Sequence, residues 1–407
     1  MTPTKSASRQ RRSFSQKNLA SRHDGPWGTQ LLAALKVPST GGYVGTHGFH
    51  PYPGRFHPHL AHSVLKLAGR PGIRVLDPFM GGGTTLVEAM RLGQEGWGND
   101  LNPVALLVAR ERTRPRDHQA ASELEALVQA LAEAVMETRT AKKAPLVRRA
   151  GLERVKGFYA PHILAEMIQW ITRIDALPEG PQRETLRAVF SSLVVKFSLR
   201  RSDSAEEEKP VAHPKGAISR FMVAKCRELL RAQQTLLARG KTPPRVTLLN
   251  ADARHLDTLP AKRVDLLLTS PPYPGTYDYA DQHRLRMDWL QLNANVFEQG
   301  ELGARRAGEN AVGSTWRQDM TQALGEMARL ARPGASLFLV VGDWLERSQP
   351  VDGRLALQQM AATQGWQAAS WASIQRETFH SNTLWAKSGK WEHILQCVKP
   401  MEEPFLF

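Results

Sequence analysis

The chain contains almost no cysteine. Its 407 residues include only two, Cys226 and Cys397, which are too few for a disulfide framework or for a zinc site with four cysteine ligands. No apolar run is long enough to cross a membrane, and the N-terminus lacks the apolar core of a secretory signal. Nothing repeats internally. Together these absences predict a globular protein of the reducing cytoplasm.

Acidic residues are outnumbered, 39 against 54 basic ones, and the formal net charge is +15 at pH 7. Because Lys and Arg displace counterions from phosphates, this balance favours a polyanionic partner, although basic proteins of other kinds share it. Residues 1–24 are rich in Lys, Arg, Ser and Gln and nearly free of apolar side chains. We expect a disordered basic tail there, since too little surface can be buried to offset the entropy of ordering. A transit peptide is the weaker interpretation because an amphipathic apolar face is missing.

The first informative motif is a strand that runs into three glycines. Val75 and Leu76 lead through Asp77 to Gly81-Gly82-Gly83, after which apolar residues recur at helical spacing. Glycines at such a turn let the backbone bend tightly and approach a ligand closely. No lysine follows them, which excludes a P-loop, and Leu86 stands where a dinucleotide fingerprint has its third glycine.

An acid follows this loop at the spacing of a nucleotide site. Residues 95–99 have the pattern of a second short strand, and Asp100 comes directly after it. In nucleotide-binding α/β folds, an acid about 20 residues beyond the first strand accepts hydrogen bonds from ribose hydroxyls. Taken alone, the pattern leaves phosphate, dinucleotide and sulfonium-nucleoside ligands open.

The second informative motif is Ser270-Pro271-Pro272-Tyr273. It comes one residue after Val264–Leu268, an apolar run typical of a buried parallel strand. Two prolines cannot continue a central strand, so the chain must leave the sheet at its carboxyl edge, where open α/β sheets bind ligands. The turn presents a hydroxyl, two carbonyl oxygens and an aromatic ring. That set suits a flat base with an exocyclic amine.

Together the two motifs resemble those of the DNA amino-methyltransferases, enzymes that use S-adenosyl-L-methionine to methylate exocyclic nitrogens. Residues 77–85 are similar to the cofactor loop of that family, with Gly82 where serine or threonine is commoner. Ser270–Tyr273 is similar to the catalytic tetrapeptide, and a first residue of Ser is typical of the cytosine-N4 branch, whereas Asp is typical of adenine-N6 enzymes. The resemblance implies cofactor contacts from Asp77, Pro78, Phe79, Gly81, Gly83, Thr84, Thr85 and Asp100.

Three weaker matches extend the resemblance to roughly residues 43–110 and 244–400. His50–Pro58, which contains Arg55, resembles the segment that helps hold the methionine end of the cofactor. Asn250–Ala253 resembles an acid-bearing turn near the adenine, which implies a cofactor contact from Asp252. Glu392–Leu395 resembles the last strand of the domain.

Neither cysteine follows a proline in a strand-to-loop turn, so a C5-cytosine methyltransferase is excluded. The irregularly spaced histidines at 47, 50, 57, 59 and 62 predict no metal site.

Strands alternate with helices on both sides of the middle of the chain, which predicts a doubly wound, mostly parallel sheet. The resemblance implies a Rossmann-like class I methyltransferase fold with a helical insertion. We expect a cofactor half at 25–110, the insertion at 111–240, with a loop from Arg200 to Lys209, and a catalytic half at 241–407. The insertion either recognises the target or only braces the sheet. The residues that favour nucleic-acid contact are Arg200, Arg201, Arg220 and, beside the tetrapeptide, Tyr277.

The expected substrate is double-stranded DNA. An amine paired inside the duplex is reached only when its base is flipped out. Acceptors on its protons, the Ser270 hydroxyl and the Pro271 carbonyl, would localise its lone pair for attack on the methyl group, while Pro272 and Tyr273 complete the turn and stack the base. Adenine-N6 or RNA-base methylation by the same fold, and a non-catalytic nucleic-acid binder, are the alternatives. A partner restriction endonuclease is left open.

Overall fold

The computed structural model describes residues 20–36, 44–140, 152–202, 205–208, 213–237, 242–275, 278–304, 309–376 and 390–402. Its centre is an eight-stranded sheet in the order β1-β11-β12-β8-β7-β2-β3-β6. The strands are β1 (Ser21–Asp24), β2 (Arg74–Asp77), β3 (Glu95–Asn99), β6 (Val246–Leu249), β7 (Val264–Thr269), β8 (Ala331–Gly342), β11 (Gln367–Arg376) and β12 (Lys390–Val398).

The five strands from β6 to β8 are parallel, and β12, β11 and β1 continue the sheet with antiparallel pairs. From β2 the chain moves outward to β3 and β6, then returns to β7 on the other side of β2. The strand order therefore reverses between β2 and β7, where doubly wound sheets open a ligand crevice at their carboxyl edge. Both motifs follow these two strands, so the predicted doubly wound fold is confirmed.

Alternating side chains of the central strands enter two different cores, which is why these strands are apolar throughout. On β8, Phe338 and Val340 pack with helices on one face, whereas Leu337, Leu339 and Val341 pack on the other. The first face is covered by α1 (Gly28–Leu35), α2 (Pro58–Ala68) and α3 (Thr84–Arg91). The second is covered by α12 (Glu309–Leu330) and α13 (Gly353–Thr363).

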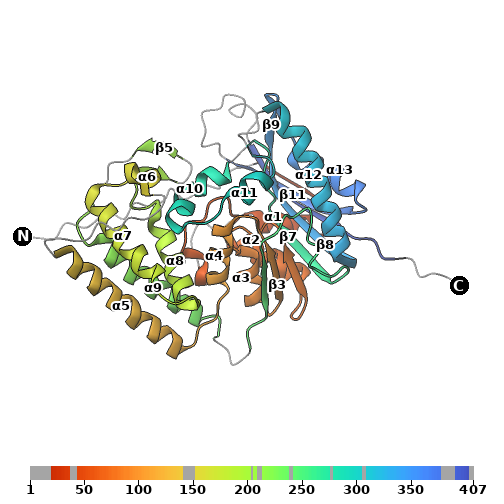
Figure 1. The fold of residues 1–407 in the computed structure, drawn as a ribbon. Helices are drawn as coiled ribbons and strands as arrows, with labels where there is room; N and C mark the ends of the chain where they lie inside the picture. Colours follow the sequence, from red (N-terminus) through yellow and green to blue (C-terminus); the bar gives the residue numbers. More distant parts are fainter. Residues whose placement is uncertain are drawn as a thin grey trace, which may run out of the picture.

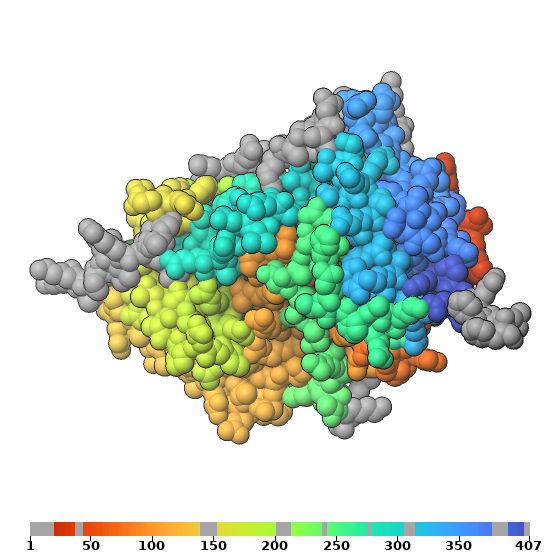
Figure 2. Space-filling model, turned by 45° about the vertical axis from the view of Figure 1, so that its right-hand side comes forward, coloured from red at the N-terminus to blue at the C-terminus, as the bar shows by residue number. Residues whose placement is uncertain are grey.

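A block of helices lies beside the sheet, on the left in Figure 1. Its buried side chains form one cluster that also contains residues of α4 (Pro103–Arg112), α10 (Tyr279–Leu290) and α11 (Asn295–Gly300). The block is therefore packed into the rest of the fold. In Figure 2 the teal segment that holds α10 and α11 lies between the block and the blue C-terminal strands and helices. The helices of the block are α5 (His118–Thr140), α6 (Leu152–Val155), α7 (Pro161–Asp175), α8 (Pro181–Val194) and α9 (Ala217–Gln234).

Short elements complete the described chain. They are the 3-10 turns η1 (Gly45–Gly48) and η2 (Lys156–Phe158) and two small antiparallel ribbons, β4 (Arg200–Ser202) with β5 (Ala205–Glu208), and β9 (Trp344–Glu346) with β10 (Gln349–Val351). No helix within the described ranges is long and apolar enough to cross a membrane.

Two local expectations were wrong. Residues 21–24, assigned to a disordered tail, form β1, because their backbone pairs with the edge strand β11; residues 1–19 lie outside the described residues. Residues 200–202 and 205–208, expected as part of a loop, form the β4–β5 ribbon, whose polar sequence gives no apolar alternation to signal strands. The predicted strands and helices that carry the two motifs are confirmed.

Candidate active site

A cavity opens at the carboxyl edge of the sheet between the two motifs. About 660 Å³ of space there is not filled by protein atoms, a volume that includes open solvent at the mouth of the cavity. One wall comes from the glycine loop and Asp100, and the opposite wall contains Ser270 and Pro272. Seven of the residues expected in the site therefore line one cavity, namely Pro78, Phe79, Gly81, Asp100, Asp252, Ser270 and Pro272.

The glycine loop turns through left-handed backbone conformations. Gly81 has φ 48° and Gly83 has φ 78°, values that residues with a Cβ rarely adopt. Gly83 precedes the first residue of α3, so the free N–H groups of that helix begin beside the loop. The loop therefore needs glycine at both positions to turn from β2 into α3.

Asp100 holds the loop from the neighbouring strand. Its Oδ2 accepts a hydrogen bond from the Gly81 N–H at 2.8 Å, and its Oδ1 accepts one from the Asn102 N–H at 2.9 Å. Burial nevertheless raises the pKa of Asp100 to about 6. A carboxylate that lines a cavity and is short of solvation is well placed to accept hydrogen bonds from a ligand.

Asp77 does not line the cavity, but its side chain forms hydrogen bonds to both the glycine loop and the end of β7, which form the two walls. Its carboxylate accepts hydrogen bonds from the Thr85 hydroxyl at 2.6 Å and from the Thr269 hydroxyl at 2.7 Å, and from the Phe79 N–H at 3.2 Å. Thr269 is the last residue of β7, directly before the tetrapeptide. The Asp77 side chain thus fixes the glycine loop against the strand that presents Ser270.

Gly82, where the family more often has serine or threonine, lies against a buried guanidinium. Arg112 Nη1 donates to the Gly82 carbonyl at 2.7 Å, and Nη2 donates to the carbonyls of His47 and His50 at 3.1 and 2.8 Å. A Cβ at Gly82 would lie 2.4 Å from Nη1. Arg112 therefore occupies the space of a side chain at position 82 and ties the loop to the segment before α2.

We expect Gly82→Ser to destabilise the protein by roughly 1–3 kcal/mol, the usual range for overpacking a filled site. The double variant Gly82→Ser/Arg112→Ala should lose less than the sum of the two single changes, because Arg112→Ala vacates the space. Thermal and denaturant unfolding of the three variants measures this coupling. Strict additivity of the single effects would contradict the contact.

The tetrapeptide turn is held by two side-chain hydrogen bonds. The Ser270 and Tyr273 hydroxyl oxygens lie 3.2 Å apart, and the Trp316 indole N–H donates to the Pro272 carbonyl at 2.9 Å. Trp316 is fully buried on α12 and packs edge-to-face on Trp344, 5.0 Å between ring centroids. The motif is therefore fixed from the helix beneath it, a support that no sequence signal indicated.

The remaining walls come from segments outside the two motifs. Tyr52 lines the cavity, receives a hydrogen bond on its hydroxyl from Asn102 Nδ2 at 3.1 Å, and packs its ring 4.7 Å from His283. Phe297 of α11 and Glu301, whose Oε1 accepts from the Tyr279 N–H at 2.6 Å, line the opposite side. Tyr52 lies in the His50–Pro58 segment, which already pointed to the cofactor by its resemblance to the family. The sequence around Phe297 and Glu301 has no motif, so only the fold could reveal their contribution.

Other expected residues lie elsewhere. Arg55 is not among the cavity-lining residues and donates to the His47 carbonyl at 2.6 Å. Asp252 lines the cavity but is already paired with Arg254, 2.6 Å between Nη2 and Oδ2. The lining also lacks Gly83, Thr84, Thr85, Pro271 and Tyr273.

Among the described residues expected to contact nucleic acid, Arg200 and Arg220 make no hydrogen bond, ion pair or ring contact with each other. Arg200 stacks over Phe158, 4.9 Å from guanidinium to ring, and Arg220 is exposed on α9. The side chain of Arg201 and all of Tyr277 lie outside what the structure describes. Their role stays a prediction.

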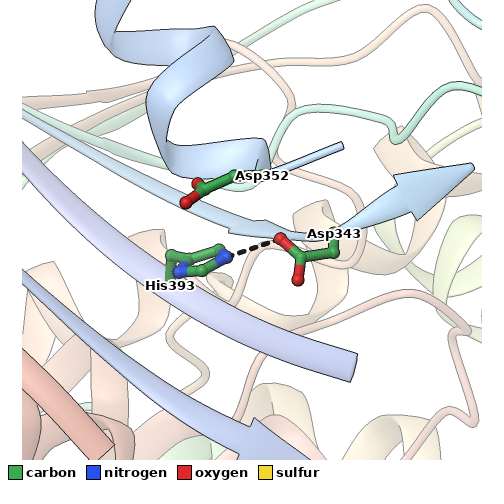
Figure 3. Close-up of side chains that lie close together, drawn as sticks. All are labelled: Asp343, Asp352 and His393. Carbon is green, nitrogen blue, oxygen red and sulfur yellow. Dashed lines mark hydrogen bonds and ion pairs between the residues drawn. The ribbon is translucent and has the colours of Figure 1, made fainter. Parts of the chain in front are cut away.

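A polar cluster of Asp343, Asp352 and His393 lies just past the carboxyl end of β8 (Figure 3). His393 Nε2 lies 2.8 Å from Asp343 Oδ1, and His393 Nδ1 lies 2.7 Å from the Ser373 hydroxyl. Asp352 comes close to both but caps α13 by accepting from the Leu355 N–H at 2.9 Å. Asp343 also accepts from the Gly353 N–H at 3.1 Å. Both carboxylates thus accept hydrogen bonds from the N-terminal N–H groups of α13. The positive end of the helix dipole at this place disfavours binding of a cation.

Comparison with known proteins supports the family. The sequence model of the DNA methylase family matches residues 4–111. The type II methyltransferase M.MjaII of Methanocaldococcus jannaschii is 22% identical over 394 residues, with 73% of this chain and 72% of the relative covered. The type II methyltransferase M.MvaI of Kocuria varians is 26% identical over 268 residues, with 61% of this chain and 58% of the relative covered.

Among solved structures, TrmN from Thermus thermophilus resembles the chain with a TM-score of 0.35 and 15% identity, covering 85% of this chain and 50% of that one. The strand order and the two motifs at the switch point of the sheet agree with the sequence matches. Over part of its length the chain is similar to DNA methyltransferases, whose cofactor is S-adenosyl-L-methionine.

Proposed function

We propose that the protein transfers a methyl group from S-adenosyl-L-methionine to the N4 amine of a cytosine flipped out of double-stranded DNA. The observation that carries the proposal is the single cavity shared by the glycine loop, Asp100 and Ser270. A cofactor held by the loop would have its reactive end beside the tetrapeptide, which supplies the hydrogen-bond acceptors for an amine.

The residues of the cavity fit the cofactor. Gly81 has no side chain, so the cofactor can come close to the backbone of the loop. The Asp100 carboxylate would accept hydrogen bonds from the two ribose hydroxyls. Asp252 also lines the cavity, and its charge is balanced by Arg254. Apolar walls from Phe79 and Phe297 suit a flat adenine ring. When bound, the cofactor supplies a methyl group activated by the adjacent sulfonium.

The tetrapeptide would prepare the amine. Its lone pair is delocalised into the ring, and acceptors on its two protons localise the pair on nitrogen. The Ser270 hydroxyl and the Pro271 carbonyl are these acceptors, and Trp316 fixes the neighbouring carbonyl so that the turn does not shift. Because no covalent bond to the enzyme is needed, positioning is the main source of rate, worth up to roughly 7–11 kcal/mol in the best-oriented systems.

Cytosine is preferred over adenine because of Ser270. An aspartate at this position, which is typical of the adenine-N6 branch, would be charged and larger. A partner restriction endonuclease stays a prediction. Incubation with labelled cofactor and duplex DNA, single-stranded DNA or RNA tests the substrate class. Label that enters RNA alone would exclude a DNA enzyme.

Cofactor affinity should depend on pH through Asp100. Burial places its pKa at about 6, above the usual 3.8, so the free protein takes up a proton as pH falls through 6. Ribose hydroxyls need the ionised form as acceptor, and the dissociation constant should therefore rise, by up to about tenfold per pH unit below 6. Calorimetry between pH 5 and 8 measures this trend.

Asp77 also has a pKa of about 6, but it does not line the cavity. Asp100→Asn therefore shows which of the two carboxyl groups causes the pH dependence, because it removes the titration of Asp100 alone. The variant should bind more weakly at pH 8 and show little pH dependence. Equal wild-type affinities at pH 5 and pH 8 would remove Asp100 from the cofactor site.

A further inference from the structure

Lys390, the first residue of β12, lies beside the tetrapeptide. β12 runs antiparallel to β8, so its beginning reaches the carboxyl edge of the sheet, where β8 ends at Gly342. The space above Gly342 is bordered by Lys390 Cε and by Tyr273 Cε2, each 3.5 Å from the position a Cβ would take. The lysine stem, the edge of the tyrosine ring and the Trp391 carbonyl therefore all border the space over a residue that has no side chain.

The Lys390 ammonium is partly buried and has no hydrogen bond or ion pair in the described part of the chain. The two acids near it are already engaged. Glu392 pairs with Arg376 at 2.5 Å, and Asp343 accepts from His393 and two backbone N–H groups. Burial accordingly lowers the pKa of Lys390 despite the attraction of both acids.

A partly buried ammonium without a partner is unfavourable unless an acceptor arrives. Packing alone does not require a lysine at position 390, because a methionine would fill the same space without burying a charge. The group that comes to this place in the proposed reaction is the extruded nucleotide, whose base stacks on Tyr273. It carries oxygen acceptors on its base and on its backbone.

We propose that Lys390 is a substrate-binding residue that donates a hydrogen bond to an oxygen of the extruded nucleotide. This inference rests on the proposed function and adds a residue from a strand that neither motif contains. The acceptor is either the base carbonyl or a phosphate oxygen. A base carbonyl would also favour cytosine, because adenine offers only a C–H at the corresponding place.

The test compares Lys390→Met with wild type on a duplex that contains the protein's own methylation site, mapped in DNA from cells that express it. We expect kcat/KM for DNA to fall roughly 10- to 100-fold, the range for losing a hydrogen bond to a charged group, with the cofactor dissociation constant unchanged. Lys390→Arg should recover part of this loss. Lys262→Met is the matched control, because Lys262 is exposed and pairs with Glu402 at the other edge of the sheet.

A substrate with methylphosphonate groups at the target nucleotide distinguishes the two possible acceptors, because it lacks the charged phosphate oxygen but keeps the base carbonyl. If a phosphate is the acceptor, they should slow wild type to the level of Lys390→Met and leave the variant unchanged. If the base carbonyl is the acceptor, both proteins should slow by the same factor. Equal kcat/KM for wild type and Lys390→Met would overturn the inference while the proposed function stands. A wild-type protein that methylates no DNA would overturn the proposed function first.

Discussion

Ser270→Ala should lower kcat for methyl transfer by roughly 10- to 100-fold while leaving cofactor affinity within about twofold of wild type. The hydroxyl lines the cavity and accepts one of the amine protons in the proposed mechanism, so its loss affects the reacting nitrogen and not the cofactor wall. Single-turnover rates with saturating cofactor, together with calorimetry of cofactor binding, separate the two quantities.

Two tyrosine variants serve as controls for that prediction. Tyr273→Phe removes the hydroxyl that lies 3.2 Å from Ser270 but keeps the ring, and should have the smaller effect. Tyr273→Ala removes the stacking platform, a contact worth ~1–3 kcal/mol for a base, and should raise KM for DNA as well. If Ser270→Ala keeps the wild-type rate, the hydroxyl is not an acceptor in the reaction.

Asp77→Ala should have the largest effect on the fold of the site. The carboxyl group is buried and accepts hydrogen bonds from the Thr269 hydroxyl, the Phe79 N–H and the Thr85 hydroxyl, the last of which also lies 3.3 Å from the Leu268 carbonyl. Leaving the Thr269 and Phe79 donors without this acceptor should lower the free energy of unfolding by roughly 2–4 kcal/mol. Activity should fall with it, because the glycine loop and the tetrapeptide lose their common support. Denaturant unfolding and steady-state kinetics measure the two effects.

Asp77→Asn provides the matched comparison. Burial raises the pKa of Asp77 to about 6, so the folded protein binds a proton between about pH 4 and 6 that the unfolded chain does not. The stabilising contribution of this group is therefore present at low pH and declines as pH rises through 6. The asparagine variant should lack that decline. A wild-type stability that rises through this window in step with Asp77 ionisation would contradict the assignment.

The sequence predicted the parts of the site that local physics dictates. Glycines at 81 and 83 and the prolines at 271 and 272 restrict the backbone wherever they occur, and the apolar strands before them place both turns at one edge of a parallel sheet. Asp100 was found by its spacing from the first strand. These are short-range rules, which hold without knowledge of the rest of the fold.

The supporting residues could not be predicted in this way. Trp316, Arg112 and Lys390 reach the site from distant helices and strands, and nothing in their neighbouring sequence differs from an ordinary buried or charged position. β1 was missed for a similar reason, since an edge strand of polar residues forms only because β11 offers it a backbone to pair with. Arg55 was expected at the cofactor but instead holds the turn before α2.

The identity of the methylated nucleoside is the most direct test of the central claim. Purified protein would be incubated with duplex DNA that contains its mapped site and with S-adenosyl-L-methionine carrying an isotopically labelled methyl group, and the digested DNA would be analysed by mass spectrometry. We predict labelled N4-methylcytosine, formed roughly 10- to 100-fold more slowly by Ser270→Ala. Labelled N6-methyladenine as the only product would contradict the choice of base, and unlabelled DNA would contradict the proposed activity itself.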